Sequence, residues 1–199
     1  MMKSEREFKL KVFPSLGLSI ILPFIFIFNN ASNSGLQNLS HSTFYNIYFC
    51  GLMIPNVVYM LQFSENYKAA WVYKSVPISN MNHVNKGVLK AALVRYIFPL
   101  FLIQSIIFMY LFGVEMLPNL IVVILNIALL TIVSFKILVN ALPFTLAFEN
   151  VKPDTLKMLA AMFIIGLLAL VHYVIQLFGI YILIGYLIIL LIINYIAWK

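Results

Sequence analysis

Charged residues are scarce in this sequence. Only 10% of its 199 residues are charged and 63% are apolar, with a mean hydropathy of +1.01. Soluble domains average about 25% charged residues, so this composition excludes a water-soluble globular domain. A crossing of the membrane uses about 20 apolar residues, which leaves little length for a separate catalytic domain. The sequence therefore predicts a protein that acts in or beside a bilayer.

Groups that carry chemistry are also few. The single cysteine, Cys50, excludes an internal disulfide and a multi-cysteine metal site, and the three histidines are scattered. There is no G-x-x-x-x-G-K-[ST] phosphate loop, G-x-S-x-G elbow or H-E-x-x-H motif, and none of the six carboxylates lies deep in an apolar run. We therefore expect no enzyme activity, no metal and no cofactor in this chain. The net charge of +7 is distributed as in a membrane protein, so nucleic acid is not expected as a partner.

Long apolar runs set the predicted fold. They predict an all-α, polytopic membrane helical bundle of about six transmembrane helices. The last two runs are separated only by Gly179. One crossing cannot absorb about 60 Å of helix, so a tight hairpin near Gly179 is favoured over a break at Gly185. The expected spans are 12–28, 43–63, 93–113, 118–140, 158–178 and 180–198.

The basic residues give the orientation. All 13 lysines and arginines fall in alternate segments, namely the N-terminus, the segments after the second and fourth spans, and the C-terminus. The three intervening segments contain none. Lys and Arg concentrate on the cytoplasmic side, so both termini are expected to be cytoplasmic.

The N-terminus is expected to form a separate element. Residues 1–11 are predicted to be a cytoplasmic amphipathic segment, with a capping box from Ser4 to Glu7 and an apolar face at Phe8 and Val12. Pro14 would end or bend it before the chain enters the transmembrane domain, predicted at 12–199.

The longest extramembrane segment, about 64–92, follows the second span. We expect two short helices separated by a turn at Pro77, with Ser64 capping the first and Ser79 or Asn80 the second. Tyr67 and Trp71 are four residues apart and share a face. Such a segment is either an interfacial anchor or a docking surface for a cytoplasmic partner.

Polar residues within the spans are the other candidates. Asn56, Gln104, Asn126 and His172 would either form interhelical hydrogen bonds or line a translocation path. His172 could titrate, but without an intramembrane carboxylate a packing role is favoured over proton transfer. Pro55 and Pro99 are expected to bend the second and third spans.

Three strings resemble a known family. Ser64-Glu65-Asn66-Tyr67-Lys68-Ala69-Ala70-Trp71, followed by Pro77-Ile78, Gly87, Lys90-Ala91 and Pro99, resembles a stretch in permease subunits of bacterial ABC-type exporters. The opening segment from Arg6 to Gly17 and the string Leu142-Pro143-Phe144 resemble other parts of those proteins. The similarity covers most of the chain, although its motifs are short.

The resemblance implies a permease without its own ATPase, in the plasma (inner) membrane. ATP would bind a partner ATP-binding cassette subunit, and a second permease copy or paralogue and membrane lipids would be further partners. The docking, or coupling, helix would contain Glu65, Tyr67, Lys68, Trp71 and Lys74. The family motifs belong to longer chains, so a complete subunit, a split subunit, a fragment and the C-terminal half of a longer permease stay open. Neither cargo nor direction of transport follows from the residues.

Two other classes of function remain open. A membrane-embedded enzyme would gather His172, Gln104 and Asn126 around one cavity. A structural or assembly subunit would place small residues such as Ser105 and Gly166 at helix contacts and have no water-filled path.

Overall fold

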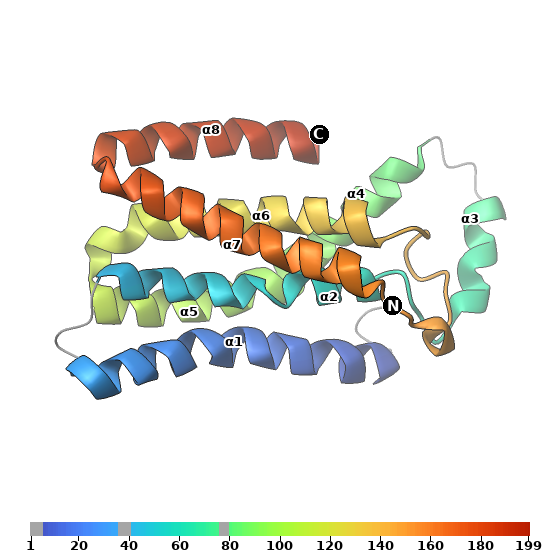
Figure 1. Cartoon of the computed structure of the whole chain (residues 1–199). Coiled ribbons are helices and arrows are strands. Elements are labelled where there is room, and N and C mark those ends of the chain that lie inside the picture. Colours follow the sequence, from blue (N-terminus) through green and yellow to red (C-terminus); the bar gives the residue numbers. More distant parts are fainter. Residues whose placement is uncertain (1–5, 36–40, 76–79) are drawn as a thin grey trace.

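Five long apolar helices dominate the computed structural model, which describes residues 6–35, 41–75 and 80–199 (Figure 1). Each is long and apolar enough to cross a membrane, which confirms a helical, multi-pass membrane character. They are α1 (Arg6–Ser34), the continuous Met81–Phe112 rod that contains α4 (Met81–Ala92) and α5 (Phe98–Phe112), α6 (Leu117–Leu138), α7 (Thr155–Leu177) and α8 (Ile180–Trp198).

The predicted second span is split. It consists of the 3-10 helix η2 (His41–Gly51) and the short α-helix α2 (Ile54–Met60), which follow each other along the bundle (Figure 1). The break precedes Pro55, which lies in the first turn of α2, where its missing N–H costs nothing. At Gly51 a Cβ atom would lie 2.8 Å from Cγ1 of Ile165, so glycine permits a close approach to α7. The segment is therefore not one of the five long helices, and its crossing stays a prediction.

Helix α1 differs from the expected N-terminal arrangement. Residues 6–11 are its first turns, and the helix continues through Pro14 without ending. Phe8 and Val12 are fully buried, and the Phe8 ring contacts that of Tyr96 at 6.2 Å between centroids. Their spacing correctly indicated an apolar stripe, but this stripe faces the bundle and not a membrane surface. Ser4 of the expected capping box lies outside the described residues.

Proline also shapes the third predicted span. The five residues Leu93–Ile97 (η4) form a π-helical turn shortly before Pro99, which lies in the first turn of α5. Proline cannot donate to the carbonyl four residues earlier, and a local π turn absorbs this loss. The helix therefore continues from α4 through the π turn into α5 without ending at Pro99. As a result, the second helix expected in the 64–92 segment is the first part of the third span.

The predicted hairpin at Gly179 is confirmed. α7 ends at Leu177 and α8 begins at Ile180, while Gly185 lies inside α8. Gly179 adopts φ 97° and ψ 174°, a region that is essentially restricted to glycine. Its N–H donates to the carbonyl of Gln176 at 3.1 Å, which closes the turn.

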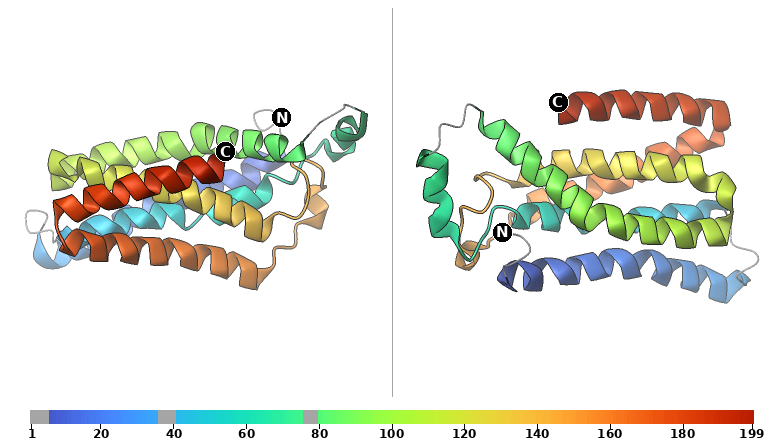
Figure 2. Two further views of the ribbon diagram at one scale, coloured as in Figure 1. Left: turned by 90° about the horizontal axis from the view of Figure 1, so that it is seen from above. Right: turned by 180° about the vertical axis from the view of Figure 1, so that it is seen from behind.

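The helices segregate the charge. Successive passes run in alternate directions. The start of α1, residues 61–75, the start of α4, the 139–154 connection and the end of α8 therefore lie toward one end of the bundle (Figures 1 and 2). Apart from Arg95, which lies midway along the Met81–Phe112 helix, the described basic residues lie in segments at or near this end, which we call the basic end. The described residues at the other end, namely Gly35, 113–116 and 178–179, include no basic residue.

Apolar side chains cover much of the outer surface. On α7 and α8, Leu156 is 80% exposed and Tyr181 is 87% exposed. Soluble monomers rarely expose contiguous apolar surface of this extent. These faces suit contact with lipid, in agreement with the composition.

Candidate functional site

A largely buried cluster of polar side chains joins four elements near the α7–α8 end of the bundle. The Tyr48 hydroxyl of η2 lies 2.8 Å from Nδ1 of His172 on α7 and 2.8 Å from Nδ2 of Asn126 on α6. Nε2 of His172 lies 3.0 Å from Oδ1 of Asn119, and the Tyr186 hydroxyl of α8 donates to Oδ1 of Asn126 at 3.4 Å. We call these five residues the polar network.

The network has one consistent set of donors. Asn126 Nδ2 donates to the Tyr48 oxygen, so the Tyr48 O–H donates to Nδ1 of His172. The ring then carries its proton on Nε2, which donates to the side-chain oxygen of Asn119. His172 is therefore assigned the neutral Nε2–H tautomer, with both ring nitrogens satisfied. No described carboxylate takes part, so the geometry favours the packing role over proton transfer.

Local sequence explains how these side chains meet. Asn119 and Asn126 are two turns apart on α6, about 10 Å along its axis, and both are buried. Tyr45, one 3-10 turn before Tyr48, places its ring edge against His172 at 5.3 Å between centroids. The close approach of η2 to α7 at Gly51 brings both tyrosines within reach of His172.

A second polar cluster lies between α1, α2 and α5. Asn56 donates to Oγ of Ser15 at 2.6 Å, and Gln104 Nε2 donates to the carbonyl of Ser19 at 2.7 Å. Oε1 of Gln104 has no partner among the described atoms. A cavity of about 20 Å³ borders Ser19 and Gln104, which is room for about one water molecule.

The four predicted in-span residues therefore form two separate sets. Asn126 and His172 belong to the polar network, whereas Asn56 and Gln104 bind α1. The structure does not bring Gln104 to the cavity that the enzyme hypothesis requires.

Sequence reasoning missed three members of the network. Tyr48 and Tyr186 are two of 11 tyrosines, and nothing in the sequence distinguishes them from the others. Asn119 lies at the edge of a predicted span, next to Pro118. The repeat of asparagine after seven residues on one helix was the available signal for Asn119.

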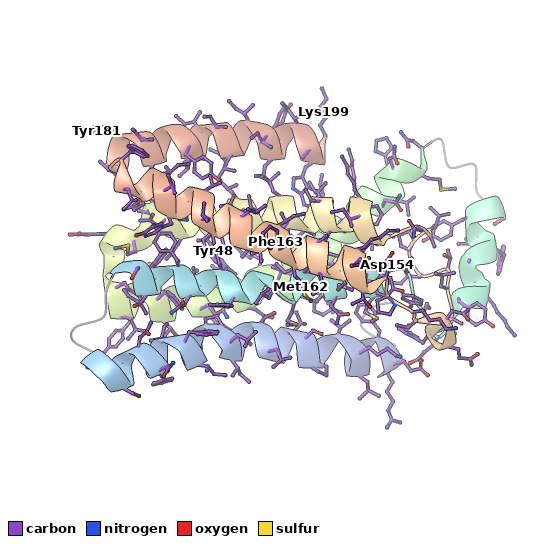
Figure 3. The ribbon with its side chains drawn as sticks, in the orientation of Figure 1. Tyr48, Asp154, Met162, Phe163, Tyr181 and Lys199 are labelled. Atoms are coloured by element: carbon purple, nitrogen blue, oxygen red, sulfur yellow. The ribbon has the colours of Figure 1, made fainter. Side chains whose placement is uncertain are left out.

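An open apolar groove of about 750 Å³ borders the network. It runs between η2 and α7, and its lining includes Tyr48, Met162 and Phe163, which Figure 3 labels. Apart from the two tyrosine hydroxyls, only apolar side chains and a glycine line it. Such a groove suits lipid chains better than ions or water.

The predicted docking segment projects from the basic end (Figure 1). A 3-10 helix, η3 (Tyr67–Trp71), continues into the α-helical turn α3 (Val72–Ser75). Lys68 and Glu65 are exposed, Tyr67 is 38% exposed and Trp71 is 66% exposed. Helix formation begins two residues after Glu65, whose Oε1 accepts from the backbone N–H of Glu7. The side chain of Lys74 and the proline turn at residue 77 lie outside the described part of the structure.

Of the two helix caps predicted in the 64–92 segment, that of the second helix is confirmed and that of the first is not. Asn80 caps α4, because its side chain accepts from the N–H of Asn82. Oγ of Ser64 accepts from the N–H of Asn66, one residue before η3, so it orders the entrance without being the N-cap.

The docking segment is held against the 142–146 region. The N–H of Ser64 donates to the carbonyl of Leu146 at 2.9 Å, and the Tyr73 hydroxyl donates to the carbonyl of Pro143 at 3.1 Å. Burial raises the pKa of Tyr73 above its ordinary value, which keeps this donor protonated. Phe144, with a left-handed φ of 61°, donates its N–H to the carbonyl of Leu61. These bonds fix the base of the segment, while Tyr67 and Trp71 stay accessible. The expectation that these two residues share a face is wrong, because a 3-10 helix has three residues per turn and places residues four apart about 120° from each other.

Within the described residues, no group of three or more His, Cys, Asp or Glu side chains is arranged to hold a metal ion. Comparisons with protein-family models, curated proteins and solved structures found no match to this chain.

Proposed function

We propose that this chain is a permease subunit of an ABC-type exporter, coupled to a separate ATPase through the docking segment 64–75. The observation that carries the proposal is the exposure of two aromatic residues, Tyr67 and Trp71, on a segment whose base is hydrogen-bonded to the bundle. Aromatic residues on a rigid support are typical of protein contact sites. In this proposal the membrane is the plasma (inner) membrane, and the basic end faces the cytoplasm.

The contacts of the segment support a coupling role. Two strings that resemble exporter permeases, Ser64 to Trp71 and Leu142-Pro143-Phe144, lie close together. Tyr73, two residues after the first string, donates to the carbonyl of Pro143 in the second. Backbone hydrogen bonds also join residues 61, 62 and 64 to residues 144–146, between α2 and α7. A force applied to the segment would therefore reach both helices. ATP binding and hydrolysis on the partner would shift the bundle between two arrangements of its helices.

The sequence contains no phosphate-binding loop, so ATP would bind only the partner subunit. A second permease copy or paralogue would complete the translocation path. Lipid would contact the exposed apolar faces of α7 and α8.

The test is purification of the tagged chain from its native membranes in mild detergent, followed by mass spectrometry. We expect a stoichiometric ATPase that carries a G-x-x-x-x-G-K-[ST] motif. Trp71→Glu should reduce its recovery at least tenfold. Asn150→Glu, which adds the same charge at another exposed position of the basic end, should leave recovery unchanged. Recovery of no such ATPase, or equal recovery with Trp71→Glu, would contradict the proposal.

A structural or assembly subunit is the second candidate. It is favoured by the polar network, whose members satisfy one another and connect helices without lining a polar path. In the same experiment this function predicts recovery with membrane subunits only. An embedded enzyme has less support, because Gln104 lies in a different cluster from His172 and Asn126.

A further inference from the structure

A cavity of about 680 Å³ opens between α4, α6 and α8 at the basic end. Figure 2 shows the C-terminal end of α8 near α4, and Lys90 Nζ lies 6.0 Å from the centroid of the Trp198 ring. One part of the lining is apolar and another is polar and basic. The apolar part includes Leu89, Ile132, Phe135, Ile193 and Ile196, and the polar part is formed by Asn82, Asn85, Lys86 and Lys136.

The two lysines have no counter-charge in this cavity. No aspartate or glutamate belongs to its lining, and neither Lys86 nor Lys136 has a carboxylate partner among the described ion pairs. Lys86 is in the second turn of α4 and Lys136 in the last turn of α6. Both therefore lie where the predicted spans meet the cytoplasmic interface, a depth at which lipid phosphates are found.

An unused acceptor lies in the same lining. Oδ1 of Asn85 is buried and has no hydrogen-bond partner among the described atoms. A buried polar atom without a partner is costly, so a bound donor there would be favourable. Phosphates supply acceptors for the lysines, and headgroup hydroxyls supply donors.

We propose that this cavity binds an anionic phospholipid with a hydroxylated headgroup. The lysines neutralise the phosphate, Asn85 accepts from a headgroup hydroxyl, and an acyl chain lies along the apolar side near Phe135 and Ile196. Basic pockets between transmembrane helices on the cytoplasmic side are known to bind acidic headgroups. A free phosphate ion would use the lysines but leave the apolar side unfilled. The site is independent of ATPase docking, because it shares no residue with the segment 64–75.

Native mass spectrometry of the full chain in detergent tests the proposal. Phosphatidylglycerol is titrated against phosphatidylcholine of the same chain length, and we expect at least tenfold tighter binding of one phosphatidylglycerol. Each lysine near an anionic lipid is worth about fivefold in affinity, so Lys86→Gln combined with Lys136→Gln should weaken binding about 25-fold. Lys152→Gln, an exposed lysine at the basic end that does not line the cavity, is the matched control.

Glycerol 3-phosphate separates the lipid from free phosphate esters, because it carries the charged group without acyl chains. We expect it not to displace the lipid at equal concentration. Equal affinity for both lipids, unchanged binding by the double lysine variant, or full displacement by glycerol 3-phosphate would each overturn the proposal.

Discussion

Replacing Tyr48 by phenylalanine tests the polar network with the loss of one oxygen atom. The Tyr48 hydroxyl accepts from Asn126 and donates to His172, each at 2.8 Å, so Tyr48→Phe removes two hydrogen bonds. It also leaves Nδ2 of Asn126 and Nδ1 of His172 buried without these partners. The aromatic ring and its packing are retained.

The expected cost follows from interhelical hydrogen bonds in membrane proteins. Such bonds contribute about 0.6 kcal/mol on average and about 1.7 kcal/mol at most. Two bonds therefore predict a loss of about 1–3 kcal/mol in the free energy of unfolding. Reversible unfolding in mixed micelles with increasing dodecyl sulfate, followed by helical circular dichroism, measures this difference.

Tyr45→Phe is the matched control. Tyr45 lies on the same helix and also contacts the His172 ring, but its hydroxyl has no described hydrogen bond. We expect a change within about 0.5 kcal/mol, as for a substitution that removes no buried contact. Combining Tyr48→Phe with His172→Phe should cost less than the sum of the two single changes, because both remove the same bond. An equal effect of Tyr48→Phe and Tyr45→Phe, with additive behaviour in the cycle, would refute the network.

Two further predictions concern the turn at Gly179 and the number of crossings. Gly179→Ala should lower the free energy of unfolding by about 1–3 kcal/mol, because alanine is strained in the backbone conformation of Gly179. Gly185→Ala, at an open position within α8, should not destabilise the protein. Equal effects of the two substitutions would contradict the assigned turn. In a Cys50→Ala background, single cysteines at Arg6 and Lys68 should react with a membrane-impermeant thiol reagent from the same side of the membrane, since η2 and α2 return the chain to the basic end. Labelling from opposite sides would show that this segment does not cross.

The sequence was informative wherever one physical rule acted alone. Comparing the helix length with the bilayer thickness located the Gly179 hairpin. Side-chain chemistry narrowed the N-cap of α4 to Ser79 or Asn80, and Asn80 is the cap. The sequence placed lysine and arginine in alternate segments, and the described segments of this kind lie at or near one end of the bundle. Each of these features depends on local residues and not on which helices are neighbours.

Features that depend on neighbouring helices were not predictable. The spacing of Phe8 and Val12 predicted an apolar face, but spacing cannot show whether that face packs against the bundle or against lipid. At the split of the second span, Gly51 lies close to Ile165, a residue far from it in the chain. Likewise, His172 was identified as a packing residue, but its bond to Tyr48 joins positions 124 residues apart.

Site-specific crosslinking at position 71 tests the central claim most directly. A photoreactive phenylalanine analogue replaces Trp71 in one sample and Glu115, at the opposite end of the bundle, in another. After irradiation of native membranes, the proposal predicts a crosslink from position 71 to a phosphate-loop ATPase, and none from position 115. Crosslinks from position 71 to lipid alone, or ATPase crosslinks of equal yield from both positions, would contradict a docking role for this segment.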